Sequence, residues 1–262
     1  MNALFRTGLV GAALFASVCA RADLVIDTFA DDQIVRDATA SAVIPFSTAY
    51  SGGSYSQECN AGVLLGGCRE LYVQKTAGDP GNLTTGVNVV FAASDSASNK
   101  FIFNSGQAPN SGFAVVRWDG VEENANTGTT AYDSSLRGNT FLADLTSFGD
   151  SFLFSYTADL AFNIVIEAWD TAGGVVSATF SGLGGNVLIN DFFEFADFPP
   201  GVIDFTQLAG LQVIINPEGS TVSLDMSFSS ITAGRVPEPG SLALAGLALL
   251  GVGASARRKM VG

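Results

Sequence analysis

The clearest pattern of apolar and polar positions lies near the end of the central part of the chain. Apolar residues occupy every second position there, at Val222, Leu224, Met226 and Phe228. A period of two places these four side chains on one face of a strand and the polar residues between them on the other. The pattern therefore predicts a half-buried β-strand, with Asp225 on its polar face.

Two segments upstream also have strand patterns. Phe152, Phe154 and Tyr156 again occupy every second position, which predicts another strand. Apart from one asparagine and one glutamate, the segment Phe162–Trp169 is apolar on both faces. A segment of that kind is typical of a strand in the middle of a sheet.

Short runs bounded by Gly, Asn, Asp, Ser or Pro predict further strands at Asp23–Asp27, Glu70–Lys75, Val87–Ala92, Lys100–Phe103, Phe113–Trp118, Val175–Phe180, Asp191–Phe195 and Leu211–Ile215. We interpret the Gly/Ser cluster Ser51–Ser56 as a surface loop. No segment before Gly240 has a convincing helical period, and no long linker divides the series. The expected fold class is therefore all-β, with a single β-sandwich or jelly-roll domain over residues 23–234.

The first 22 residues have the three parts of a signal peptide. Arg6 supplies the positive charge, Gly8–Val18 is apolar, and Ala20 and Ala22 form a small-x-small cleavage site. The apolar stretch has 11 residues, too few to cross about 30 Å of hydrocarbon. We therefore expect signal peptidase to cut after Ala22 and to leave Asp23 as the first mature residue.

The C-terminal end has the order of parts of a stop-transfer segment. Pro237, Glu238 and Pro239 precede an apolar run, and the run ends in a basic cluster. The 17 residues 240–256 would span about 25 Å as a helix, at the lower limit for a membrane span. The basic cluster should stay in the cytoplasm and leave the domain outside; it consists of Arg257, Arg258 and Lys259.

This order of Pro-Glu-Pro, a glycine-spaced apolar helix and a basic end closely resembles the PEP-CTERM sorting signal of Gram-negative bacteria. The resemblance covers residues 235–262. It implies processing at Pro237-Glu238-Pro239 by a membrane exosortase and delivery to the cell surface or extracellular matrix. It also links the protein to extracellular polysaccharide. The alternative is an ordinary tail anchor.

The middle of the chain is similar to a group of small exported β-sandwich proteins that carry this tail. The similarity rests on four short patterns: Val25-Ile26-Asp27-Thr28-Phe29, Gly66-Gly67-Cys68-Arg69-Glu70-Leu71, Trp118-Asp119-Gly120 and Asp204-Phe205-Thr206. It implies the sandwich fold, and it supplies no activity.

Charge and composition exclude several classes of function. Residues 23–235 contain 24 acidic and 7 basic residues, a net charge of −17, which repels nucleic acid and anionic membranes. The chain has no histidine, so a Ser-His-Asp triad, a Cys-His pair and His-ligated metal sites are excluded by residue type. We therefore expect no nucleic-acid partner, and we assign no catalytic residue.

The chain has three cysteines. Cys19 leaves with the signal peptide, and the bulky Val18 before it disfavours lipid attachment. Cys59 and Cys68 remain, in a chain that folds in an oxidising compartment, so we expect them to form a disulfide bond. The alternative is a redox or metal pair, but a four-ligand zinc site could then be completed only by carboxylates.

Aspartates near the mature start suggest a second kind of site. Extracellular jelly rolls often hold a structural Ca²⁺ with oxygens from the first and last strands, which makes Asp27, Asp31 and Asp225 the candidate ligands. Ordinary solvation is the simpler interpretation, because the chain has no Asp-x-Asp-x-Asp-Gly loop. We therefore expect no cofactor, with a structural Ca²⁺ as the alternative.

Three functions fit these observations. The first is a non-catalytic surface or matrix protein that is displayed through its tail and associates with extracellular polysaccharide. The second is a secreted carbohydrate-active enzyme, since glycoside cleavage needs only two carboxylates about 5 to 10 Å apart. The third is a lectin-like module in which Trp118 and Trp169 stack on sugar rings, although both tryptophans also fit core positions that lead into aspartate turns.

Overall fold

The computed structural model describes residues 22–30, 33–37, 54–60, 64–78, 85–90, 100–106, 108–120 and 140–236. In these residues the protein is all-β, as predicted, with thirteen strands in two sheets. The helical elements of this part are 3₁₀ turns of three residues: η1 (Leu65–Gly67), η2 (Leu145–Ser147), η3 (Phe195–Asp197), η4 (Phe205–Gln207) and η5 (Pro217–Gly219).

The strands form a seven-stranded and a six-stranded sheet, and every strand pair is antiparallel. The seven-stranded sheet has the order β11 (Ile189–Glu194), β8 (Ser151–Ala158), β13 (Asp225–Gly234), β6 (Lys100–Asn104), β5 (Thr85–Val90) and β2 (Gln33–Asp37). Its seventh strand, β1 (Leu24–Asp27), pairs with the second half of β13. The six-stranded sheet has the order β10 (Val175–Gly182), β9 (Phe162–Asp170), β12 (Leu208–Ile215), β7 (Ser111–Trp118), β4 (Cys68–Ala77) and β3 (Ser54–Cys59).

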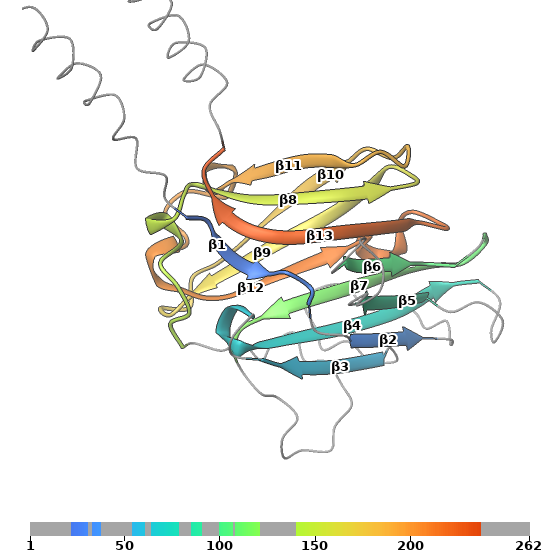
Figure 1. Cartoon of the computed structure of the whole chain (residues 1–262), viewed down its shortest axis with the longest axis horizontal. Coiled ribbons are helices and arrows are strands. Elements are labelled where there is room, and N and C mark those ends of the chain that lie inside the picture. The colour runs from blue at the N-terminus through green and yellow to red at the C-terminus, as the bar shows by residue number, and fades with distance from the viewer. Residues whose placement is uncertain are drawn as a thin grey trace, which may run out of the picture.

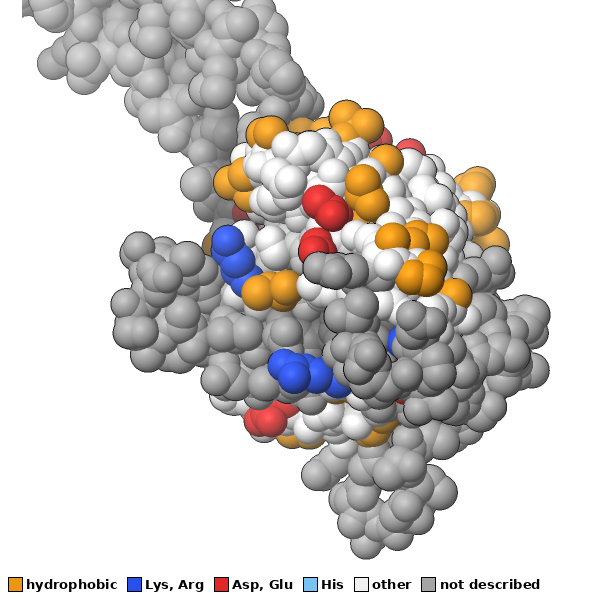
Figure 2. All heavy atoms as spheres, turned by 90° about the vertical axis from the view of Figure 1, so that its right-hand side faces the viewer, with side chains coloured by type: hydrophobic (Ala, Val, Ile, Leu, Met, Phe, Trp, Pro, Cys, Tyr) orange, Lys and Arg blue, Asp and Glu red, His pale blue; other side chains and the backbone are white. Residues whose placement is uncertain are grey.

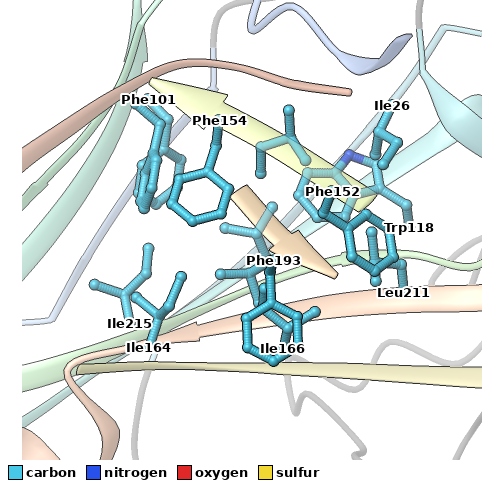
Figure 3. Close-up of a cluster of buried hydrophobic side chains, with 14 of the residues drawn as sticks. Ile26, Phe101, Trp118, Phe152, Phe154, Ile164, Ile166, Phe193, Leu211 and Ile215 are labelled. Atoms are coloured by element: carbon cyan, nitrogen blue, oxygen red, sulfur yellow. The ribbon is translucent and has the colours of Figure 1, made fainter. Parts of the chain in front are cut away.

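The two sheets face each other across one hydrophobic core (Figure 1). The core is rich in phenylalanine, and Phe154 and Phe228 pack edge to face with their ring centroids 6.1 Å apart. Ile164 and Ile166 lie across the core from Phe154 (Figure 3). Aromatic pairs of this geometry stabilise a core beyond the area that they bury.

Most strands lie where the sequence predicts them, but β2 and β3 were not predicted. Ser54–Cys59 carries mostly polar residues and lies at the edge of its sheet, so its pattern does not differ from that of a loop. The prediction of a loop over residues 51–56 is therefore wrong for Ser54, Tyr55 and Ser56. The segment is a strand because it pairs with β4, and its own residue pattern carries no information about that pairing.

The last strand is longer than predicted and begins later, at Asp225. Ser223 has a positive φ of 59° and lies in the turn before it, while Val222 is 44% exposed. A β-bulge interrupts the strand, because Phe228 pairs with Tyr156 and Ile231 pairs with Phe154. The extra residue breaks the period of two, so the alternating pattern in the sequence stops at the bulge.

The start of β1 and the end of β13 lie side by side at one corner of the sandwich (Figure 1). Leu24 pairs with Ala233, so the predicted first mature residues adjoin the last residues before the tail. Among the described residues, no helix has the length and apolar character needed to cross a membrane. The membrane helix predicted at residues 240–256 lies outside the described residues, as do residues 1–21 of the predicted signal peptide.

Candidate functional site

The two predicted processing positions flank the folded domain. Ala22 and Asp23 are exposed directly before β1, where signal peptidase is expected to cut. At the other end, β13 finishes at Gly234, and two residues separate it from Pro237. The residues Pro237, Glu238, Pro239, Arg257, Arg258 and Lys259 lie outside the described part of the chain, so their roles stay predictions.

Cys59 and Cys68 form a disulfide bond, as predicted. Cys59 ends β3 and Cys68 begins β4, and the two residues stand directly opposite each other in the antiparallel pair. The backbone N–H of Asn60 donates to the carbonyl of Gly67 at 2.7 Å beside the bond. The disulfide therefore fastens an edge strand to its neighbour.

The carboxylate of Asp27 is fully buried inside the sandwich and accepts four hydrogen bonds. Its oxygens lie 3.2 and 3.0 Å from Arg69 Nη1. Trp118 Nε1 donates to Oδ2 at 2.9 Å, and the backbone N–H of Phe29 donates to Oδ1 at 2.6 Å. Burial raises the pKa of Asp27, while Arg69 and the two N–H groups oppose that rise. This is a structural ion pair.

Three of the four short patterns on which the family resemblance rests meet at this ion pair. Asp27 belongs to the first pattern, Arg69 to the second and Trp118 to the third. The second and third patterns also touch through their glycines, since a Cβ added to Gly66 would lie 2.8 Å from the backbone nitrogen of Gly120. The patterns therefore specify how the two sheets join.

The structure does not bring the candidate calcium ligands together. Both oxygens of Asp27 are used by Arg69, Trp118 and Phe29. Asp27 pairs with Ile231 on β13. Ile231 and Asp225 are six residues apart in this strand, which separates Asp27 from Asp225 by about 20 Å. Asp31 lies outside the described residues. No group of three or more acidic or cysteine side chains within the described ranges could hold a metal ion.

Trp118 and Trp169 are 0% and 2% exposed, so the predicted alternative of a tryptophan platform for sugar rings is wrong. Trp118 faces the core. Trp169 faces the other side of the six-stranded sheet, where its ring covers Gly210 and lies 5.8 Å from the Arg117 guanidinium carbon. Trp118 is the last residue of β7, and Trp169 is the last residue but one of β9.

Asp170 forms the aspartate turn that was expected after Trp169. Its Oδ1 accepts hydrogen bonds from the backbone N–H groups of Ala172 and Gly174, at 2.9 and 2.8 Å. Its Oδ2 accepts one from Asp204, at 2.9 Å. Burial acts to raise the pKa of Asp170, but these backbone donors, with that of Gly173, together lower it. Asp170 therefore ties the β9–β10 turn to the loop before η4.

A row of polar side chains crosses the outer face of the six-stranded sheet. Glu70, Arg117, Gln212 and Glu167 stand opposite one another in β4, β7, β12 and β9. Arg117 Nη1 lies 3.7 Å from Glu70 Oε2, and Arg117 Nε donates to Gln212 Oε1 at 3.4 Å. Gln212 Nε2 in turn donates to Glu167 Oε1 at 3.0 Å. We call these four residues the polar row.

The centre of the polar row is closed to solvent. Glu70 and Arg117 are 1% and 0% exposed. Asp119 also lies 3.8 Å from Arg117 Nη1, so two carboxylates share one buried guanidinium. A glycosidase instead needs an acid and a second carboxylate on either side of an open substrate cleft. The polar row is an ion-paired network and does not have that arrangement.

The end of the sandwich away from Gly234 carries exposed aliphatic side chains and two neighbouring aspartates (Figure 2). The backbone N–H of Asp225 donates to Asp159 Oδ1 at 2.9 Å. Burial raises the pKa of Asp225, and the charge of Asp159 adds to this. Asp159 follows the end of β8, and Asp225 begins β13. The loops around them carry aliphatic side chains that are 42–70% exposed: Leu160, Leu183, Val187, Leu188 and Val222.

A shallow groove of about 370 Å³ lies on the outer face of the seven-stranded sheet, over β11, β8 and β13. Leu153, Ser155, Asn190 and Phe192 line it. Cross-strand pairing sets this arrangement, because Phe192 stands opposite Leu153 and Asn190 opposite Ser155. The Ser155 hydroxyl donates to Asn190 Oδ1 at 2.5 Å. Phe192 is 41% exposed, so we call this hollow the Phe192 groove.

The bulge in β13 supplies the third side of the Phe192 groove. Ser229 and Ser230 both fall opposite Ser155, between the pairs formed by Phe228 and Ile231, and Ser230 lines the groove. Bulges commonly redirect a side chain in this way. Val236, just before the Pro-Glu-Pro motif, lines the same groove. No pattern in the sequence marks these residues as part of a site.

The last strand of the β-sandwich ends two residues before the Pro-Glu-Pro motif. Residues 235–259 match the family model described as the PEP-CTERM protein-sorting motif. The chain is therefore an exported protein that is sorted through the membrane by this tail, as the sequence predicts. No curated protein matches the sequence significantly.

Solved structures with a similar arrangement are distant. One is the family 11 carbohydrate-binding module of the cellulosomal cellulase Lic26A-Cel5E of Clostridium thermocellum, at 10% identity over 84% of this chain and 99% of that chain, with a TM-score of 0.35. Another is the agarase AgWH50C, at 12% identity over 82% of this chain and 26% of that chain, with a TM-score of 0.39. Likenesses with TM-scores this low do not indicate a function.

Proposed function

We propose that the protein is a non-catalytic component of the cell surface or extracellular matrix of a Gram-negative bacterium, where it binds polysaccharide. The observation that carries the proposal is the sorting motif at residues 235–259, which directly follows the last strand of the sandwich. The domain is thus built to be exported and released as a unit. We assign no metal and no cofactor to this function.

Two processing enzymes act on the chain under this proposal. Signal peptidase cuts after Ala22, and an exosortase acts at Pro237-Glu238-Pro239. The two prolines cannot donate backbone hydrogen bonds to a sheet, which favours an extended segment that an enzyme can reach. The net charge of −17 over residues 23–235 keeps the released domain away from nucleic acid.

The carboxylates of the described residues support a role in binding more than one in catalysis. Buried ion pairs with Arg69 or Arg117 hold Asp27, Glu70 and Asp119. Asp159 and Asp225 lie among the loops at the end of the sandwich away from Gly234. An exposed phenylalanine next to serine and asparagine side chains, as in the Phe192 groove, suits a sugar ring better than it suits bond cleavage.

The sorting half of the proposal is tested by replacing Pro237, Glu238 and Pro239 with alanine. We expect this variant to fold with the melting temperature of the wild type, but to stay in the inner membrane at unprocessed mass. Cell fractionation and intact-mass measurement, in strains with and without an exosortase, would show this. The matched control replaces two exposed prolines of the domain, Pro199 and Pro200, and should be processed normally.

Release of the alanine variant to the surface at the wild-type mature mass would refute the sorting role and leave a simple anchor. The binding half is tested separately, by co-sedimentation of the protein with the extracellular polysaccharide of its own host. Release of shorter saccharides from that polysaccharide during incubation would contradict the non-catalytic role and indicate a carbohydrate-active enzyme.

A further inference from the structure

We propose that the Phe192 groove is the binding site for a neutral polysaccharide chain, an inference that rests on the function proposed above. The groove combines an exposed aromatic ring with hydrogen-bonding side chains on the outer face of the seven-stranded sheet. Its volume of about 370 Å³ is within the range of small-ligand sites, roughly 300 to 1,000 Å³.

Phe192 provides the apolar contact. Its side chain is 41% exposed although it belongs to a strand, and Leu153 beside it on β8 extends the apolar surface. Sugar rings carry C–H groups on their faces and hydroxyls around their edges. A flat aromatic ring can therefore cover one face of the sugar and leave the sugar hydroxyls free to form hydrogen bonds. Aromatic side chains in such positions dominate the energetics of binding sites.

Asn190 and Ser230 provide the hydrogen bonds. Asn190 is exposed and uses its Oδ1 to accept from Ser155, so its Nδ2 is available as a donor. In the part of the chain that the structure describes, no protein group bonds to Nδ2 of Asn190 or to the hydroxyl of Ser230. These groups stand on either side of Ser155, Asn190 on β11 and Ser230 at the bulge of β13, so donors lie on both flanks of the groove.

The charge of the groove selects the class of polysaccharide. None of its eight lining residues is basic, and one of them, Asp191, is acidic. The net charge of −17 over residues 23–235 adds long-range repulsion of anionic chains. Uronic-acid, sulfated and phosphorylated polysaccharides are therefore disfavoured, and a neutral chain meets no electrostatic barrier.

The experiment compares Phe192→Ala with Phe141→Ala, which removes an exposed phenylalanine outside the groove, 51% exposed. The probes are the neutral and the anionic fractions of the host's own extracellular polysaccharide, separated by ion exchange. Binding of the full chain in detergent is measured by affinity electrophoresis. We expect Phe192→Ala to lower affinity for the neutral fraction about ten-fold or more.

Phe141→Ala should bind as the wild type does, and Phe192→Tyr should keep affinity within about three-fold because it retains the ring. Asn190→Ala combined with Ser230→Ala should give a smaller loss than Phe192→Ala. Since Phe192, Asn190 and Ser230 are outside the core, melting temperatures should stay unchanged. Binding should also be insensitive to salt.

The outcomes separate the two proposals. Equal binding by Phe192→Ala and Phe141→Ala would overturn the groove as the site while polysaccharide binding itself stands. Failure of the wild type to bind either fraction would overturn both the site and the polysaccharide role, and sorting would be unaffected. Salt-sensitive binding to the anionic fraction would also refute the site. So would a dimer that Phe192→Ala converts to a monomer, since the groove would then be a contact between copies.

Discussion

At the scale of single residues, Asp27 joins three distant segments through one carboxylate. Its partners Arg69 and Trp118 lie 42 and 91 positions away in the sequence. A buried ion pair contributes little net stability compared with an apolar replacement, but the loss of one partner leaves a buried charge without compensation.

We predict that Asp27→Asn lowers the free energy of unfolding by about 3 kcal/mol or more, because the Arg69 guanidinium keeps its charge in the core. Urea denaturation at neutral pH measures the change. The control Asp23→Asn removes the same charge from an exposed residue four positions earlier and should change stability little. The double variant Asp27→Asn with Arg69→Met should recover part of the loss. A loss of the same size for Asp23→Asn would argue against the ion pair.

A second prediction concerns Asp170 and pH. We expect Asp170→Asn to cost about 2 kcal/mol at pH 7, because an amide oxygen replaces a carboxylate that accepts three backbone hydrogen bonds. The pKa of Asp170 is lower in the folded than in the unfolded protein. The stabilisation is therefore fully present above the unfolded value of about 4 and is lost as the pH falls through the folded pKa.

The difference between wild type and Asp170→Asn should thus shrink in acid, which melting curves from pH 7 to pH 2.5 would reveal. Asp225→Asn is the informative comparison, because its pKa is shifted upward. That substitution should slightly stabilise the protein at neutral pH and have no effect in acid. A pH-independent loss for Asp170→Asn would mean that its charge is unimportant.

Single residues differ in how far the sequence reveals their role. Cys59 and Cys68 could be paired from export and from an even count of cysteines. Asp27 could not be recognised as a core residue, since its partner is distant and its neighbourhood is acidic. Phe192 and Phe193 are adjacent, so which of them faces solvent depends on the register with β8, and only the structure gives that register.

At the scale of elements, the disulfide holds β3 against β4 at the edge of the six-stranded sheet. β3 is mostly polar and pairs with one neighbour within its sheet, so it has few apolar contacts to keep it in place. We expect Cys59→Ser with Cys68→Ser to lower stability by about 2 to 3 kcal/mol, through the entropy of the open loop in the unfolded chain.

Chemical denaturation measures that loss, and amide hydrogen exchange should place the faster exchange in β3 and not in β9. The effect of a reducing agent on the wild type should match that of the double variant. Two free thiols titrated in the denatured, unreduced wild type would exclude the bond altogether. If exchange became faster by the same factor across both sheets, the bond would stabilise the whole domain and not only its edge.

Elements with a strong apolar pattern were predictable, and those that depend on partners were not. β8 has apolar residues at a period of two and β9 is apolar on both faces, so the sequence of each segment is enough to define it as a strand. β3 depends on pairing with β4, and the second half of β13 follows a bulge whose position is set by β8. The Phe192 groove is formed partly by that bulge. The bulge is therefore the reason that neither the end of the strand nor the groove could be predicted from the sequence.

At the scale of the whole molecule, the sequence indicated the division into leader, domain and tail because each part has its own composition. The calcium hypothesis assumed that the first and last strands lie together, but the sequence could not indicate which of their residues pair. That contact joins residues more than 200 positions apart, Leu24 and Ala233, and follows from the topology of the seven-stranded sheet.

The pairing of β1 with β13 orders events during export. A chain that crosses a membrane from its N-terminus delivers β1 first and β13 last, and β13 also pairs with β8 and β6. The larger sheet can therefore not close during threading. It closes only when the last strand emerges, and the tail begins two residues further on. We expect folding to finish while the chain is still tethered, so that an exosortase meets a completed domain.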